Sequence, residues 1–320
     1  MKTVDDFKRY FSGELTPTLQ SLEIERKKGV QMSLFIALSV VAGIAIAIAT
    51  ALSGFHFVGY IVAGAVLLTG SIVFGMKLSR IKKDVKIHYK ENVIKKIVDF
   101  VDPNLNYSAT NHISQEEFGR SKIFLNDIDR YNGDDLVEGT IGKTAVRFSE
   151  VHSEYYTTDK DGKRNYHTTF KGIFFVADFN KDFIGETIVL PDTAEKLFGK
   201  LGSWLQKMNI SRPKLIKLED PVFEKAFAVY GTDQVEARYI LTPALMERIM
   251  EFKKKSGKIY LSFLHSSVYI AIAVRKDLFE PPFYKSMLDF DIVEEYFNYL
   301  ILSVQIVEDL NLNTRIWSKE

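Results

Sequence analysis

The sequence predicts an α+β protein in which a two-helix transmembrane hairpin precedes a domain with a mainly antiparallel sheet and a long buried C-terminal helix. Three observations predict this architecture: a charge-free apolar stretch near the start, a central run of strand patterns joined by short turns, and one apolar helix near the end. Adjacent strands with helices inserted between groups are typical of α+β folds.

The apolar stretch covers residues 29–76 and contains no Asp, Glu, Lys or Arg. As a single helix it would be about 72 Å long, whereas the hydrocarbon core of a bilayer is roughly 30 Å thick. Two spans joined by a tight turn fit that thickness, and the turn is expected at Gly54. We therefore expect transmembrane helices over 30–52 and 57–76, with the lipid bilayer as the first partner of the chain.

Basic residues flank the apolar stretch on both sides and are absent from the turn. Because positively charged flanks stay on the cytoplasmic side, a two-pass protein with both termini in the cytoplasm is expected. The seven residues are Arg26, Lys27, Lys28, Lys77, Arg80, Lys82 and Lys83.

Residues 1–28 are expected to form a cytoplasmic helical segment. Thr3 with the following acidic residues predicts a short helix over Val4–Ser12, which lies on the membrane surface or packs on protein. Gly13 is expected to end it, and Pro17 to open a second helix that continues into the membrane.

Residues 77–101 are predicted to form a helical stalk that ends before Pro103. Its apolar residues recur at every fourth position, which predicts one buried face. That face packs either on the domain of the same chain or on a second copy, so a homo-oligomer is one of two alternatives. The stripe consists of Val85, Tyr89, Val93, Ile97 and Val101.

Residues 102–320 are expected to form one cytoplasmic α+β domain. Its last helix, 289–310, contains the apolar segment Tyr296–Val307. This segment is too short for a third transmembrane span, so we expect it to be a buried core helix. A capping box at Ser114 predicts another short helix. Strands are predicted over 136–140, 144–157, 164–179, 186–190, 214–218, 223–230, 258–264 and 268–274, and further helices over 192–208, 234–241 and 243–255.

Three strings, residues 170–180, 237–243 and 307–317, resemble an uncharacterised bacterial membrane-protein family, the domain of unknown function 3137. The resemblance implies an anchor in the bacterial inner membrane and a cytoplasmic domain. It also implies a LemA-like membrane protein as a partner. It implies no activity, cofactor or catalytic residue.

The long hairpin predicted over 150–169 carries aromatic residues near its tip. Tyr155, Tyr156, Tyr166 and His167 form a possible binding surface, because tyrosine offers rigid contact area and a hydroxyl. The alternative is that the rings are ordinary cross-strand pairs that cover a ribbon.

His152 and His167 lie on the two strands of this hairpin near acidic residues, so a metal site is one interpretation of them. Exposed sheet histidines are the other, because neither turn length makes them direct partners. We expect no metal and no cofactor. Scattered carboxylates could serve as acid and base, but no spacing singles out a pair; they are Asp178, Asp182, Glu186, Asp233 and Glu236.

The composition excludes several function classes. With no Cys there is no thiol nucleophile or zinc–thiolate cluster, and a net charge of +1 without a basic stripe argues against nucleic-acid binding. No nucleotide-binding or hydrolase motif occurs. We expect a membrane-anchored cytoplasmic binding or scaffolding protein. The alternatives are a membrane-tethered enzyme with a site built from scattered carboxylates, and an oligomeric pore, for which the hairpin has few polar residues.

Overall fold

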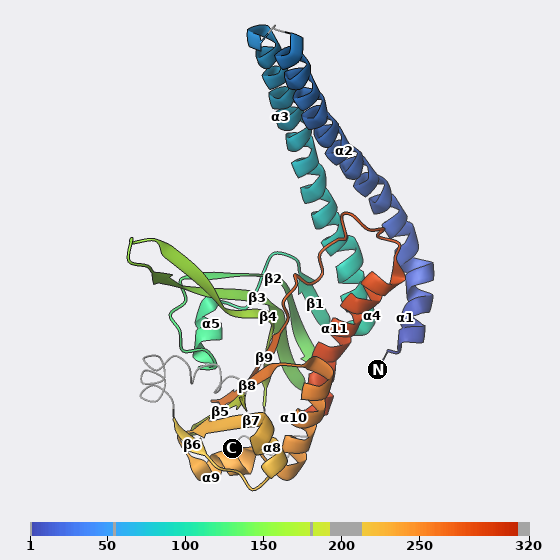
Figure 1. The fold of residues 1–320 in the computed structure, drawn as a ribbon. Helices are drawn as coiled ribbons and strands as arrows, with labels where there is room; N and C mark the ends of the chain where they lie inside the picture. The colour runs from blue at the N-terminus through green and yellow to red at the C-terminus, as the bar shows by residue number, and fades with distance from the viewer. Residues whose placement is uncertain (1, 54–55, 180–181, 193–212, 313–320) are drawn as a thin grey trace. The chain divides into compact units, whose positions relative to one another are not determined.

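The structure, a computed structural model, describes residues 2–53, 56–179, 182–192 and 213–312 (Figure 1). The chain divides into two compact units. The helical unit comprises Met1–Ile97 and Phe279–Phe297, and the sheet unit comprises Val98–Leu278 and Asn298–Glu320. The domain boundaries expected from the sequence, at residues 28, 76 and 101, stay predictions.

The helical unit begins with α1 (Val4–Tyr10), which Thr3 caps as the sequence predicted; the side chain of Asp6 in turn accepts the Thr3 N–H. The predicted end at Gly13 is wrong, because a π-helical segment, Phe11–Leu15, joins α1 to α2 (Thr16–Ser53). A glycine inside a helix costs only about 1 kcal/mol. The burial of Phe7 and Leu15, both 0% exposed, outweighs that cost and keeps the chain helical.

The second half of the helical hairpin is α3 (His56–Tyr89), which runs through a π-helical segment, Lys90–Ile94, into α4 (Lys95–Val101). Residues 77–101 are therefore helical, and their separation as a stalk stays a prediction. Its stripe is buried within the chain itself: Val85, Tyr89 and Val93 are at most 1% exposed. The ring of Tyr89 contacts that of Tyr296 edge to face at 6.4 Å, which supports packing on the same chain.

Small residues let α2 and α3 approach closely. A Cβ added at Gly43 would lie 2.5 Å from Leu67 Cγ, and one added at Gly70 would collide with the side chain of Ser39. Close backbone approach through small residues is the usual way in which apolar helices associate in a membrane. Figure 1 shows the two helices side by side.

A segment from the other end of the chain completes the helical unit. We call residues 279–289 the strap; it leads into α11 (Phe290–Asp309), which starts in the helical unit and ends in the sheet unit. The first turns of α11 pack on α1, because the ring of Phe7 stacks on Phe297 at 4.3 Å. The predicted helix over 289–310 is confirmed.

The sheet unit contains a nine-stranded sheet in the order β1-β2-β3-β4-β9-β8-β5-β7-β6, and every pairing is antiparallel. This confirms the α+β class. The strands are β1 (Leu105–Ser108), β2 (Arg130–Ile141), β3 (Thr144–Thr158), β4 (Arg164–Asp178), β5 (Glu186–Pro191), β6 (Lys214–Ile216), β7 (Phe227–Gly231), β8 (Ile259–Leu264) and β9 (Ser267–Ala273).

Both faces of the central strands are buried, which explains their nearly continuous apolar sequences. Phe174 and Phe175 point to opposite faces and are both 0% exposed. One face packs on α5 (Gln115–Arg120), where the tilted rings of Phe118 and Phe174 have centroids 4.9 Å apart. Ser114 caps α5 as predicted, and its Oγ accepts the Glu117 N–H.

One predicted strand is partly wrong. Residues 223–230 were expected to be extended, but α8 (Pro221–Ala226) occupies the first half and β7 only the second. The reason is local: Asp220 accepts the N–H groups of Val222 and Phe223, and Pro221 suits the first turn of a helix. Strand β6 also ends two residues before its predicted end at Leu218.

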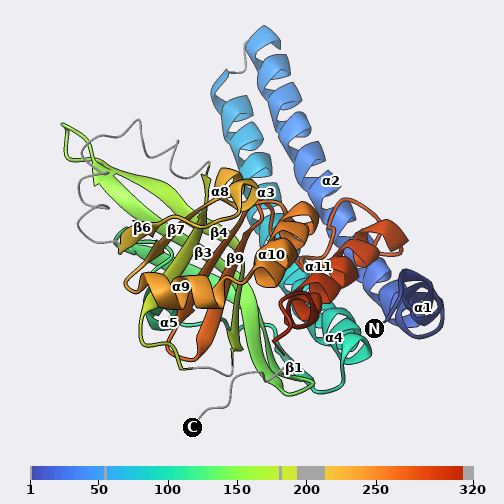
Figure 2. The same ribbon diagram turned by 90° about the horizontal axis from the view of Figure 1, so that it is seen from below.

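The helices predicted from capping signals are present. Asp233 caps α9 (Gln234–Ile240), and Thr242 caps α10 (Pro243–Ser256). The end of α10 lies beside the end of α11, where Lys255 Nζ pairs with Asp309 at 3.0 Å (Figure 2). The helix predicted over 192–208 lies outside the described residues.

Candidate functional site

The β3–β4 hairpin arranges the four predicted surface residues as two consecutive cross-strand pairs, which therefore lie on opposite faces of the ribbon. Tyr155 lies opposite His167, and Tyr156 lies opposite Tyr166. The ring centroids of the second pair are 5.9 Å apart. Cationic side chains cover these rings: the Arg130 guanidinium lies 3.4 Å from the centroid of Tyr166, and that of Arg164 lies 4.5 Å from Tyr156.

The two hairpin histidines do not converge. His152 lies opposite Lys171 and its Nε2 is 3.2 Å from Thr168 Oγ1, whereas His167 Nε2 is 2.8 Å from Thr157 Oγ1. As the sequence predicted, they are not direct cross-strand partners.

Most of the scattered carboxylates have structural roles. Glu236 accepts the N–H groups of Ile184 at 3.0 Å and Gly185 at 2.6 Å, Asp233 caps α9, and Glu186 pairs with Lys122. These contacts explain the positions of the three carboxylates without any catalytic role.

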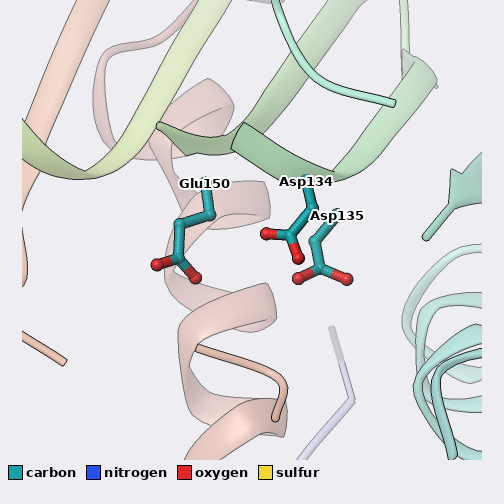
Figure 3. Close-up of side chains that lie close together, drawn as sticks. All are labelled: Asp134, Asp135 and Glu150. Carbon is teal, nitrogen blue, oxygen red and sulfur yellow. The ribbon is translucent and has the colours of Figure 1, made fainter. Parts of the chain in front are cut away.

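A different set of carboxylates converges in the sheet unit, and the sequence did not reveal it. One carboxylate oxygen from each of Asp134, Asp135 and Glu150 lies within 4.8 Å of the other two (Figure 3). We call these three residues the carboxylate cluster. Asp134 lies directly opposite Glu150, and β2 has an irregular register immediately after it. Asp135 has a φ of 59°, so the bulge turns a second carboxylate toward the first.

Two members of the cluster are buried and hydrogen-bonded, and Asp134 is half-buried. Glu150, 8% exposed, accepts the Leu278 N–H at 2.7 Å, and Asp135 accepts the hydroxyl of Tyr107. Burial above all raises the pKa of Glu150 to about 7, and the nearby Asp134 and Asp277 add to the rise. The Leu278 N–H and Lys171 act in the opposite direction.

This geometry gives the cluster two chemical capacities. Glu150 exchanges a proton close to neutral pH, which relieves the repulsion between facing carboxylates. The three groups also supply the oxygen ligands that hard divalent cations prefer. The signal that could have located the cluster is the Gly133-Asp134-Asp135 sequence in a strand, which is typical of a bulge, but only the register brings Glu150 to it.

Two helical stretches, Val4–Leu52 and Val58–Val101, are long and apolar enough to cross a membrane by length and composition. Only 6% and 18% of their apolar windows are buried within the chain. The core helix of a soluble protein passes the same compositional test but is mostly buried, so this exposure favours membrane spans. Among the described residues α11 is not a third such helix, as the sequence predicted.

No curated protein matches the chain. Among solved structures, the mycobacterial trehalose monomycolate transport factor A aligns over 67% of this chain and 95% of its own, with 10% sequence identity and a TM-score of 0.32. A TM-score this low supports no inference about fold or function.

Residues 168–312 match the family described as "Protein of unknown function (DUF3137)". The match contains two of the three strings that carried the resemblance and part of the third. It begins within β4 and includes β5 to β9 and α8 to α11. This match confirms the resemblance over residues 168–312, which are less than half of the chain.

Proposed function

We propose that this protein is a membrane-anchored binding or scaffolding protein of the bacterial inner membrane, with its sheet unit in the cytoplasm. The observation that carries the proposal is the pair of closely packed helices whose apolar windows are only 6% and 18% buried within the chain. Large apolar side chains face outward along α2, for example Leu38 at 61% and Val41 at 63% exposed. Exposed apolar patches of this extent mark membrane or protein contacts.

The orientation follows from charge. The basic residues that flank the apolar stretch all lie at the ends that the positive-inside rule assigns to the cytoplasm, and all except Arg26 are exposed. The test is accessibility of single cysteines, since the native chain has no Cys. A cysteine at Gly54 should react with an impermeant thiol reagent added to intact cells, and one at Lys160 should not. Reaction at Lys160 would overturn the orientation.

The binding role is proposed for the tip of the β3–β4 hairpin, and a LemA-like membrane protein is the partner to test. The half-buried tyrosine rings and the exposed guanidinium groups of the tip suit recognition of a protein surface. Photocrosslinking from the position of Tyr156 should capture such a partner, and Tyr166→Ala should abolish the capture. The matched control is Tyr239, 45% exposed on α9. Equal capture from both positions would refute a specific role of the tip.

One observation favours the alternative of a membrane-tethered enzyme. The carboxylate cluster combines a group that titrates near pH 7 with two further carboxylates, as acid–base sites do. This alternative is tested by titrating the full chain with Mg²⁺ or Ca²⁺ and measuring the heat of binding by calorimetry. Binding that Asp134→Asn removes would favour the enzyme. Unchanged heats in the wild type would favour a purely structural cluster.

A further inference from the structure

The strap is fixed to α2 by a buried polar contact at its centre. Arg26 Nη1 donates to the Phe283 carbonyl at 2.9 Å, and Glu23 Oε2 accepts the Met287 N–H at 3.0 Å. Arg26 and Glu23 also pair with each other at 2.7 Å and are 8% and 5% exposed. A buried charge that loses its partner is strongly destabilising. Movement of the strap away from α2 would break these contacts, so they hold the strap in one place.

The start of the strap is fixed to α3 in a similar way. Glu280 pairs with Lys86 at 2.6 Å and with Lys90 at 3.1 Å, and Lys90 is only 1% exposed. Tyr296, in the first turns of α11, donates its hydroxyl to the Glu280 carbonyl at 2.5 Å. The strap is therefore attached to both long helices (Figure 1).

Between these attachments the strap places two aromatic rings at the foot of the apolar stretch. The Phe283 ring lies 2.7 Å from the position that a Cβ on Gly29 would take, and Gly29 is the first residue of the stretch. Tyr284 meets Phe283 edge to face at 5.2 Å and is 73% exposed. Lys82 Nζ lies 4.6 Å from the first ring and 5.7 Å from the second.

We propose that the strap is an interfacial anchor that binds the phosphate groups of anionic phospholipids, with Tyr284 at headgroup depth. This rests on the proposed membrane insertion of the hairpin. Tyrosine is enriched at the membrane interface, and Lys and Arg next to a span attract anionic headgroups. The exposed basic residues of the helix feet and the strap are Lys27, Lys28, Lys77, Arg80, Lys82, Lys83 and Lys285. The strap thereby links the bilayer surface to α11.

The depth of Tyr284 is tested on the full chain in phosphatidylcholine vesicles that contain phosphatidylglycerol. A nitroxide on Tyr284→Cys should collide with lipid-soluble oxygen more than with a water-soluble nickel chelate, whereas one on Tyr239→Cys should show the reverse. A third label, on Ile44→Cys, reports insertion of the hairpin. If the label at 44 is in lipid and that at 284 is in water, the strap inference is wrong. If the label at 44 is itself in water, the proposed membrane anchor fails.

Headgroup recognition is tested with spin-labelled phosphatidylglycerol. Replacing Lys82 and Lys285 by Gln should lower the affinity of the chain for this lipid about five-fold per lysine. The matched change at Lys143 and Lys160, exposed in the sheet unit, should leave it unchanged. Equal losses in both variants would overturn the site. Full competition by inorganic phosphate would show that it binds free phosphate instead of a lipid.

Discussion

The charge state of Glu150 determines how the stability of the sheet unit depends on pH. Its carboxyl lies opposite Asp134 and is 8% exposed, so the folded chain holds its proton more tightly than the unfolded chain does. The pKa of about 7, against an ordinary value of 4.5, corresponds to about 3 kcal/mol at roughly 1.36 kcal/mol per unit. Because the carboxyl keeps some contact with solvent, about 2 kcal/mol is the better expectation.

The sign follows from linkage. A raised carboxyl pKa contributes stability that is fully present below pH 4.5 and is lost as the pH rises through about 7. The free energy of unfolding of the sheet unit should therefore fall by about 2 kcal/mol between about pH 5 and about pH 8 through this residue. Hydrogen exchange of the strand amides in the full chain, kept in detergent, measures this change.

Two variants isolate the contribution. Glu150→Gln retains an acceptor for the Leu278 N–H but cannot ionise, so it should remove the fall. Glu138→Gln changes an exposed residue of β2, so the stability of this variant should still fall with pH as in the wild type. If the stability of the wild type rises over this range, or if Glu150→Gln leaves the pH dependence unchanged, the reasoning about the cluster is refuted.

Three further predictions concern packing. Leu300→Ala, at a position 1% exposed in α11, should cost about 2–5 kcal/mol, and an unchanged melting temperature would show that this helix is not part of the core. Val93→Asp should unfold the stalk because it buries an unpaired charge. The measurement is hydrogen exchange, in which the amides of α3 should lose their protection. A variant that stays folded but dissociates from a dimer to a monomer would instead favour packing between copies. Gly133→Ala should destabilise the sheet by about 1–3 kcal/mol, because its Cβ would meet the Glu150 carbonyl; equal thermal melts would contradict this.

The sequence by itself determined those features that depend on neighbouring residues. The charge-free stretch predicted two apolar helices, and the capping side chains of Ser114, Asp233 and Thr242 fixed where helices begin. Each of these signals acts within a few residues, so a linear pattern contains it. The error at residues 223–230 arose because strand propensity was weighed above the Asp220-Pro221 cap, which was equally visible.

Only the tertiary structure decided which distant segments meet. β5 lies between β8 and β7 although both follow it by dozens of residues, and such pairing depends on partners that no local pattern specifies. The bulge between Asp134 and Val137 sets the register in which Asp134 lies opposite Glu150, and a shift of one residue would turn the side chain to the other face. The strap likewise contacts α2 and α3 although it is far from them in the sequence: Arg26 and Phe283 are 257 residues apart. Long-range burial and hydrogen bonding select these pairs, and they exist only once the chain has folded.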